Sequence, residues 1–191
     1  DFCLSRGLGD VYKRQYYDNE KHTQADALSV IPFMDEMNYE GLSVSGLSDG
    51  YYGLTIGGEF IGRFTARELE RGINMALLQN TPQYKQAMKI RQMNEERWLK
   101  ERKMREFYWV EYNLMRKTGM LWACNEAAVD TLRKYRPHDI FLQWNGALWL
   151  QYMHKGIRED CVNEQQDLVN QIYEQNKPIP LQIEIKKFTD L

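Results

Sequence analysis

Residues Gly41 to Phe64 read GLSVSGLSDGYYGLTIGGEFIGRF, and this stretch decides the fold class. Its apolar residues alternate with other residues, and turn dipeptides interrupt them at close spacing, which is typical of short antiparallel strands. Gly57-Gly58 is a two-residue hairpin connection that suits a primed turn, because glycine adopts a positive φ without strain. The stretch therefore predicts a small antiparallel β meander.

The apolar positions assign three short strands to this meander. The first contains Leu42 and Val44, and Ser48-Asp49-Gly50 closes the turn after it. Tyr52, Leu54 and Ile56 line one face of the second strand. Phe60, Gly62 and Phe64 line one face of the third. Three short strands leave an apolar face that is not stable in water alone, so we expect another part of the protein to cover it.

Two helix start signals follow the meander. Thr65-Ala-Arg-Glu68 has the spacing of a capping box and predicts a short helix to about Arg71. Thr81-Pro82 predicts the start of a long helix that ends near Lys117, because threonine suits the N-cap and proline the first helical position. An interrupted apolar stripe marks this helix: Tyr84, Ala87, Met88, Met93, Met104, Phe107, Tyr108, Leu114 and Met115.

The rest of the chain is predicted to be mostly helical. Helices are expected at Asn125 to Tyr135, Ile140 to Lys155 and Glu159 to Gln175, followed by a last strand at Leu181 to Phe188 that can return to the sheet. The fold class is therefore α+β, with a small antiparallel β meander, a long helix and a helical tail. Trp144 and Trp149 are interpreted as the buried face of a helix, and carbohydrate stacking is the alternative.

Composition limits the possible partners of this 191-residue chain. The net charge is −2 and the charged residues are interspersed, which argues against a nucleic-acid or anionic-membrane partner. No apolar run approaches the length of a membrane span. Beside Cys3, the chain contains Cys124 and Cys161, which we interpret as two buried thiols, with a single disulfide as the alternative.

The first residues of the chain have an unusual character. Ser5 to Gln15, SRGLGDVYKRQ, resemble one translated frame of a sequencing adapter, so residues 1–15 are interpreted as an adapter-derived artefact. The alternative is an ordinary turn followed by a short strand. On the first interpretation, the natural polypeptide begins near Tyr16 and is the tail of a longer protein whose N-terminus is missing.

Ordered motifs in the meander and the helix starts resemble a known family. They are V-S-G-L-x-x-G-x-Y-x-L-x-I-x-G from Val44, G-x-F-T-A-x-E-L from Gly62, G-I-N-x-A-L-L from Gly72 and N-T-P-x-x-x-Q-A from Asn80. This region resembles the C-terminal region of bacterial SGNH (GDSL-type) hydrolases. The resemblance implies an upstream α/β/α domain with a serine nucleophile that hydrolyses esters, often acetyl groups on carbohydrates, and a periplasmic or secreted location.

The resemblance also implies a domain order. Residues 1–15 are the artefact, 16–40 connect to the missing catalytic domain, 41–79 form the meander and short helix, and 80–191 form the helical tail with a final strand. The Gly-Asp-Ser and Asp-x-x-His motifs of the family do not occur, and Asp18 and His22 are one residue too far apart. Ser48-Asp49-Gly50 has the letters in another order and is interpreted as a turn.

No residue of this chain is expected to be catalytic, cofactor-binding or metal-binding. The candidate bases are His22, His138 and His154, and each has a simpler explanation in a polar stretch, a loop or a helix end. His154 and Glu159 do not have a known metal-ligand spacing, so a surface role is expected for them. No cofactor is predicted.

These observations lead to one main functional prediction and two alternatives. The main prediction is a C-terminal accessory portion of an SGNH-type ester hydrolase that lacks the catalytic residues, with the missing N-terminal catalytic domain as its partner. The first alternative is a non-catalytic carbohydrate- or protein-binding module that uses the hairpin and the Trp-rich helices. The second is an all-helical interaction protein in which the hairpin is incidental.

Overall fold

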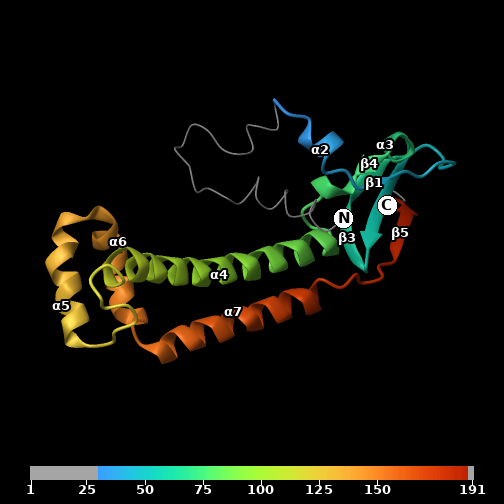
Figure 1. Ribbon diagram of the computed structural model, residues 1–191. Coiled ribbons are helices and arrows are strands. Elements are labelled where there is room, and N and C mark those ends of the chain that lie inside the picture. Colours follow the sequence, from blue (N-terminus) through green and yellow to red (C-terminus); the bar gives the residue numbers. More distant parts are fainter. Residues whose placement is uncertain (1–29, 189–191) are drawn as a thin grey trace. The chain divides into compact units, whose positions relative to one another are not determined.

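The computed structural model describes residues 30–188 (Figure 1). The adapter-like stretch 5–15, and with it Cys3, Asp18 and His22, lies outside the described residues. The architecture is α+β, with a small antiparallel sheet and a long helix, which confirms the predicted fold class. The chain divides into two compact units. We call residues 30–91 and 175–188 the sheet unit, and residues 92–174 the helical unit.

The sheet unit contains the predicted hairpin. Strands β2 (Tyr51–Ile56) and β3 (Glu59–Thr65) pair antiparallel, and Gly57 and Gly58 connect them with φ angles of 57° and 83°. These positive angles are those of a primed turn, which glycine accepts without strain. The hairpin prediction is therefore confirmed.

The third strand of the sheet is not the one that the meander predicted. Strand β5 (Ile183–Lys187) pairs antiparallel with β2, so the strand order is β3-β2-β5. Strand β1 (Gly41–Leu42) pairs instead with β4 (Ile73–Asn74) in a separate two-stranded ladder. The prediction of a three-strand meander is therefore wrong for the first strand. The backbone groups on the second edge of β2 pair with the C-terminal strand β5 and not with β1. The expected return of the last strand to the sheet is confirmed.

A β-bulge decides which residues of β3 enter the core. The register shifts between Leu54 and Thr55, because Ile61 is an extra residue opposite β2. As a result, Ile61 is buried with Leu54, while Phe60 is 57% exposed on the opposite face. The apolar residues buried in the sheet unit include Tyr52, Leu54, Ile56, Ile61, Leu69 and Met75.

Two short helices lie in the sheet unit, and a capping box fixes the start of the second. Helix α2 (Phe33–Glu36) precedes β1, and helix α3 (Ala66–Arg71) begins at the predicted capping box. The Glu68 amide donates to Thr65 Oγ1 at 3.2 Å, and the Thr65 amide donates to Glu68 Oε2 at 2.7 Å. The hydrogen bond from the Thr65 amide, and one from the Thr65 hydroxyl to the same oxygen at 2.7 Å, lower the pKa of Glu68. The short turn Met75–Leu77 then leads to Thr81, whose hydroxyl accepts from the Tyr84 amide at 3.3 Å.

The long helix and the tail follow the predicted order. Helix α4 (Pro82–Val110) continues into a π-helical turn at Glu111–Met115. Helices α5 (Glu126–Tyr135), α6 (Ile140–Tyr152) and α7 (Lys155–Gln175) complete the tail, with a 3₁₀ turn at Arg136–His138. Asn125 and Asp139 cap α5 and α6 by accepting backbone N–H groups.

The core of the helical unit contains one predicted tryptophan and excludes the other. Trp149 is fully buried with Phe107, Met115 and Leu132, as predicted. Trp144 is 66% exposed and meets the Phe141 ring edge-on, with 5.6 Å between the centroids. The prediction is wrong for Trp144, because five residues span 500° of an ideal helix of about 3.6 residues per turn and so place the two rings on different faces.

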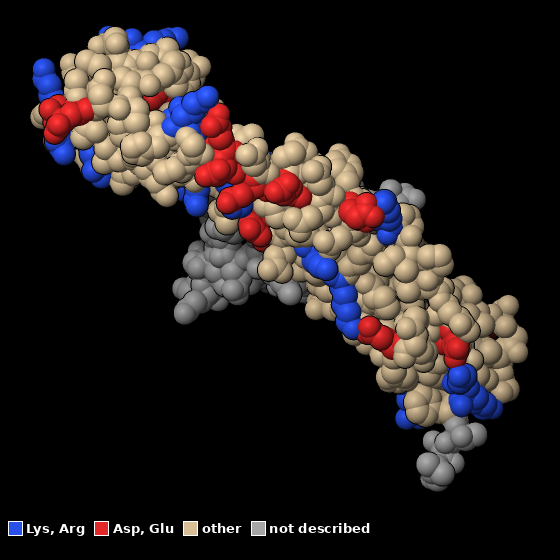
Figure 2. All heavy atoms as spheres, turned by 90° about the horizontal axis from the view of Figure 1, so that it is seen from below, with Lys and Arg blue, Asp and Glu red and all other residues tan. Residues whose placement is uncertain are grey.

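Charged side chains of both signs are distributed over the surface. On the face drawn in Figure 2, acidic groups lie beside basic groups. Ion pairs at the surface include Arg102 with Glu106 and Arg133 with Asp130. In residues 30–188, no helix combines the length and the apolar character that a membrane span requires. A periplasmic or secreted location stays a prediction.

Candidate functional site

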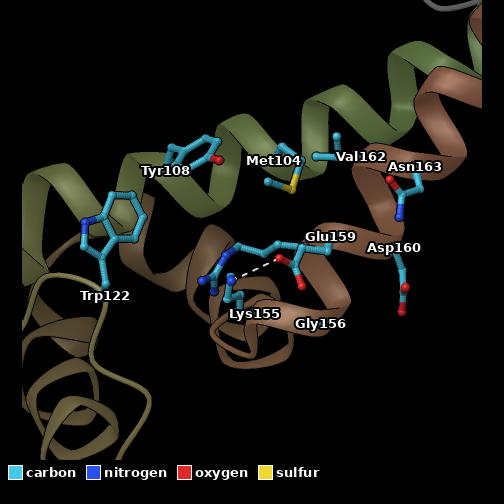
Figure 3. Close-up of a pocket in the computed structure, with 10 residues that line it drawn as sticks. Met104, Tyr108, Trp122, Lys155, Gly156, Glu159, Asp160, Val162 and Asn163 are labelled. Carbon is cyan, nitrogen blue, oxygen red and sulfur yellow. Dashed lines mark ion pairs between the residues drawn. The ribbon is translucent and has the colours of Figure 1, made fainter.

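A pocket of about 620 Å³ lies within the helical unit (Figure 3). Helix α4 contributes Met104 and Tyr108, and the turn before α5 contributes Trp122. The first half of α7 supplies the remaining lining residues: Lys155, Gly156, Arg158, Glu159, Asp160, Val162 and Asn163. The pocket thus combines an aromatic and thioether side with a charged and polar side.

Trp122 is the centre of the aromatic side. Its ring meets Tyr108 and Tyr112 edge-on, with centroid distances of 6.0 and 5.9 Å. The Phe107 ring lies 6.3 Å away at an interplanar angle of 32°. Trp122 is 45% exposed, so part of its surface is accessible to a ligand. Aromatic rings held in this way can bind a flat apolar group by stacking or by edge contacts.

The backbone of Trp122 has an unusual conformation. Its φ is 62°, in the left-handed region that costs a non-glycine residue on the order of 1 kcal/mol. The surrounding structure must therefore hold this residue in place. The Trp122 amide donates a hydrogen bond of 2.9 Å to Glu111 Oε2, which fixes the turn at this point.

Glu111 is a buried carboxyl group with a partner on each oxygen. It is 1% exposed, and its Oε1 accepts a hydrogen bond of 2.8 Å from Trp149 Nε1. It begins the π-helical turn that extends α4, and such turns occur often at functional sites. Burial of a carboxyl group is costly without hydrogen bonds, so these two donors account for its position. Glu111 thereby connects α4, α6 and the turn that carries Trp122.

Arg158 connects the charged side of the pocket to α6. Its Nη1 donates to the backbone carbonyls of Tyr152 and Met153, each at 2.7 Å, at the end of α6. Its guanidinium also lies 4.8 Å from the centroid of the Phe107 ring. Lys155 and Glu159 form an ion pair of 3.2 Å beside it, drawn dashed in Figure 3. The charged side of the pocket can therefore bind ligand groups of either charge.

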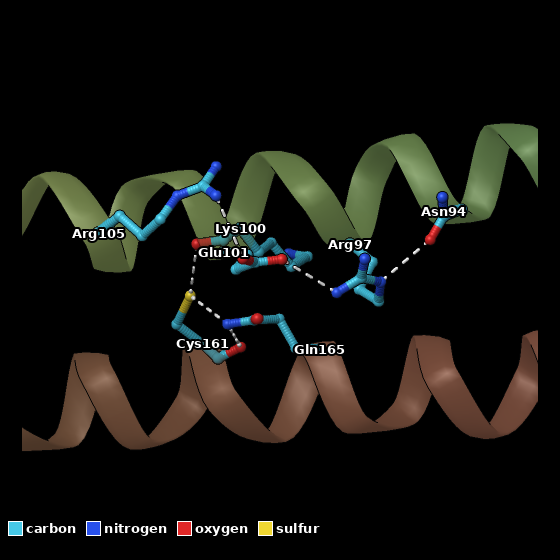
Figure 4. A network of polar contacts seen from close by, with 7 residues as sticks. All are labelled: Asn94, Arg97, Lys100, Glu101, Arg105, Cys161 and Gln165. Carbon is cyan, nitrogen blue, oxygen red and sulfur yellow. Dashed lines mark hydrogen bonds and ion pairs between the residues drawn. The ribbon is translucent and has the colours of Figure 1, made fainter.

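A polar network joins α4 to α7 next to the pocket (Figure 4). The Cys161 thiol donates to the Lys100 carbonyl at 3.7 Å, and Gln165 Nε2 donates to the Cys161 carbonyl at 3.2 Å. Along α4, Arg97 and Arg105 pair with Glu101 at 3.2 and 3.3 Å. The Cys161–Lys100 hydrogen bond links the two helices that form the pocket walls, and the ion pairs order the side chains along α4.

Three residues beside this network have shifted pKa values. The Lys100 ammonium donates to Glu164 Oε2 at 2.5 Å, which lowers the pKa of Glu164 and raises that of Lys100. Burial, with a smaller contribution from Cys161, raises the pKa of Tyr152 to about 12. The Tyr152 hydroxyl therefore stays protonated at physiological pH.

The structure places the two described candidate histidines in different turns, and one of them lies beside a cysteine. His154 Nδ1 lies 3.2 Å from Cys124 Sγ, whereas His138 ends the separate turn before α6. Cys161 is buried as predicted, but Cys124 is exposed, because it lies in the turn before α5 and not on an inward helix face. Within the described part of the chain, no group of three His, Cys, Asp or Glu residues could hold a metal ion.

Ser48 has a structural role in the sheet unit. It lies directly before the bend at Asp49 and Gly50, and its hydroxyl accepts a hydrogen bond of 2.8 Å from Lys187 Nζ. The Tyr52 hydroxyl donates to the Ser48 carbonyl at 2.9 Å. These contacts agree with the interpretation of Ser48-Asp49-Gly50 as a turn.

Sequence reasoning missed Glu111 and the backbone of Trp122. One signal was present for Glu111, because it is a single acidic residue in the apolar stretch FYWVEYNLM. No local sequence pattern predicted the left-handed backbone conformation of Trp122, since bulky residues rarely adopt it.

Comparison with known proteins relates the helical part of the chain to a deacetylase. Residues 88–177 match the model of a family described as the diltiazem deacetylase C-terminal helical domain. A solved structure of a gut microbial diltiazem-metabolizing enzyme is also similar, with 36% sequence identity and a TM-score of 0.82. That similarity covers 94% of this chain and 40% of the enzyme, so this chain spans about 40% of its relative's length. A search of curated proteins found no match.

These findings correct the predicted family. The SGNH (GDSL-type) assignment is wrong, because both matches are to diltiazem-deacetylating or diltiazem-metabolizing proteins and neither supports SGNH membership. The predicted function as a portion of an SGNH hydrolase is wrong for the same reason, and the binding-module alternative gains no better support. The motifs that carried the resemblance were a glycine hairpin, two helix starts and the short G-I-N-x-A-L-L stretch between them. Turn and cap chemistry of this kind recurs in unrelated proteins.

Proposed function

We propose that this chain is the C-terminal part of a deacetylase that removes acetyl groups from small molecules. The observation that carries the proposal is the 36% identity and TM-score of 0.82 over 94% of the chain with a diltiazem-metabolizing enzyme. The match of residues 88–177 to the C-terminal helical domain of diltiazem deacetylase supports the same role.

We infer that the helical unit contributes to substrate binding. The rings of Tyr108 and Trp122 form one side of its pocket, and charged groups of α7 form the other. This composition suits a small molecule that carries an aromatic group and a polar or charged substituent. On this proposal, the longer protein supplies the groups that react with the acetyl carbon, and this chain holds the remainder of the substrate.

The activity is tested on the complete gene product that contains this chain. The purified protein is incubated with diltiazem, and the deacetylated product and acetate are quantified by mass spectrometry and an acetate assay. The proposal predicts equal amounts of the two products, and heat-treated protein serves as the control. A folded protein that removes no acetyl group from diltiazem or from a panel of acetylated aromatic compounds would contradict it.

We also infer that the remainder of the longer protein covers the outer face of the sheet. On this face, Phe60 and Phe188 meet edge-on at 6.2 Å, and the Arg63 guanidinium lies 3.8 Å from the Tyr51 ring centroid. Gly53 lies beneath the two phenylalanines, since a Cβ there would meet the Phe188 ring at 3.0 Å. The three aromatic residues are about half exposed. A cluster of this kind usually marks a contact surface.

Hydroxyl-radical footprinting of the complete gene product tests this contact. Tyr51, Phe60 and Phe188 should be modified several times more slowly than Tyr173, an aromatic residue of α7 that is 72% exposed. Modification of all four residues at similar rates would show that nothing covers the face.

Binding of carbohydrate to this chain also stays a prediction.

A further inference from the structure

Cys124 and His154 form a close pair in the helical unit. The distance between Sγ and Nδ1 is 3.2 Å, which is within hydrogen-bond reach for sulfur. Cys124 lies in the turn before α5, and His154 lies between α6 and α7. Both side chains are exposed. The fold therefore brings a thiol and an imidazole together at a position that solvent and small reagents can reach.

The other described cysteine has a different environment. Cys161 is 4% exposed, and its thiol donates to the Lys100 carbonyl at 3.7 Å. Gln165 Nε2 also approaches its sulfur at 3.7 Å. Cys161 is thus enclosed between α4 and α7, and it provides an internal reference for reactivity in the same unit.

The Cys124–His154 pair is close in the chain to two residues that line the pocket. His154 directly precedes Lys155, and Cys124 is two residues after Trp122, and both of these neighbours line the pocket. Consecutive Cα atoms are about 3.8 Å apart, so the Cα of Cys124 lies at most about 7.6 Å from that of Trp122, on the aromatic side of the pocket. A molecule that places an aromatic group against Trp122 can therefore bring a reactive carbon to the sulfur.

We propose that Cys124 and His154 form a reactive thiol–imidazole pair, and that Cys124 is a site of covalent modification by carbon electrophiles that carry an aromatic group. The thiolate is the nucleophilic form of cysteine, and an adjacent imidazole can accept the thiol proton. With an alkyl iodide, the S–C bond forms as the carbon–iodine bond breaks, and iodide leaves with the electron pair. The proton passes from sulfur to His154 and then to solvent.

Alkylation of the intact chain with iodoacetamide at neutral pH tests the pair. Peptide mapping by mass spectrometry separates the rates of the individual cysteines. Because the His154 imidazole lies 3.2 Å from the sulfur and can accept its proton as the S–C bond forms, Cys124 should react about tenfold faster in the folded chain than in the urea-unfolded chain. Cys161 should react more slowly in the folded chain than in the unfolded chain, because its sulfur is enclosed. Equal rates for folded and unfolded Cys124 would overturn the proposal.

Two variants separate the roles of the base and of the pocket. His154→Gln should reduce the rate at Cys124 to that of the unfolded chain, and circular dichroism checks that the variant is folded. N-benzyl iodoacetamide should modify wild-type Cys124 faster than iodoacetamide does. Trp122→Ala should remove this preference, and Trp98→Ala, a change at a half-exposed tryptophan outside the pocket lining, should preserve it. An unchanged rate at Cys124 in His154→Gln would overturn the role of His154 as the base. No preference for the benzyl reagent would overturn the role of the pocket in binding an aromatic group.

Discussion

Trp149 Nε1 donates a hydrogen bond of 2.8 Å to Glu111 Oε1 in the interior of the helical unit, where the two residues are 0% and 1% exposed. The second oxygen of Glu111 accepts the Trp122 amide. One carboxyl group therefore sets the position of α6 and of the turn that forms the aromatic side of the pocket. The candidate site depends on this buried contact as well as on the residues that line it.

Glu111→Gln should destabilise the protein by about 1.5–3 kcal/mol, because an amide can accept from one N–H donor with its oxygen but presents its own NH₂ group to the other. Urea unfolding followed by circular dichroism measures the free energy of unfolding. Glu106→Gln is the matched control on the same helix, where an ion pair with Arg102 at the surface should be worth less than about 1 kcal/mol. Equal losses in the two variants would contradict the role of Glu111.

The two tryptophans of α6 should differ sharply in stability experiments. Trp149→Ala should cost about 3–5 kcal/mol, because it removes a fully buried ring and leaves a cavity. Trp144→Ala should change the free energy of unfolding by less than about 0.5 kcal/mol, since its ring is mostly exposed. Thermal unfolding measures both. If Trp149→Ala lowers the free energy of unfolding as little as Trp144→Ala does, the core does not depend on the Trp149 ring.

Two substitutions at Trp122 isolate the cost of its backbone conformation. Trp122→Ala and Trp122→Gly lose the same ring contacts, but only glycine adopts a φ of 62° without strain. The glycine variant should therefore be the more stable of the two by about 1 kcal/mol in urea unfolding. If the alanine variant is equally stable or more stable, the turn does not need the left-handed conformation.

The Lys100–Glu164 pair should make stability depend on pH at both extremes. The pKa of Glu164 is lowered below 4.5, so its contribution is present above pH 4.5 and is lost as the pH falls through the lowered value. The pKa of Lys100 is raised above 10.5, so its contribution is present below pH 10.5 and is lost as the pH rises through the raised value. The difference in Tm between wild type and Glu164→Gln should shrink at both ends, and a constant difference would contradict this.

The sequence predicted those elements whose signals are local. The Gly57-Gly58 hairpin and the Thr65 capping box depend on a few adjacent residues, and the structure contains both. The pairing of β1 with β4, and of β5 with β2, depends on long-range contacts that alternation does not encode. The β-bulge that turns Phe60 outward could not be predicted from alternation either. One extra residue exchanges the two faces of a strand, and its position depends on the pairing with β2.

The candidate site was less predictable than the fold. Met104 and Tyr108 were placed on the apolar stripe of the long helix, but the pocket also needs α7 and the turn at Trp122. Glu111 resembles a surface glutamate until its two donors are known, and those donors come from 11 and 38 residues away. The family assignment failed because it relied on turns and caps, whereas the matched stretch 88–177 lies mainly in the helices that follow.

The most direct test of the account is a kinetic comparison of diltiazem deacetylation by the complete gene product in three forms: wild type, Trp122→Ala and Trp98→Ala. Loss of an aromatic contact worth about 0.5–1.5 kcal/mol should raise KM about two- to tenfold in Trp122→Ala, with kcat little changed. Trp98 does not line the pocket, so Trp98→Ala should retain the wild-type KM. A wild-type protein without deacetylase activity, or a Trp122→Ala variant with an unchanged KM, would contradict the assignment of this chain as the substrate-binding C-terminal part of a deacetylase.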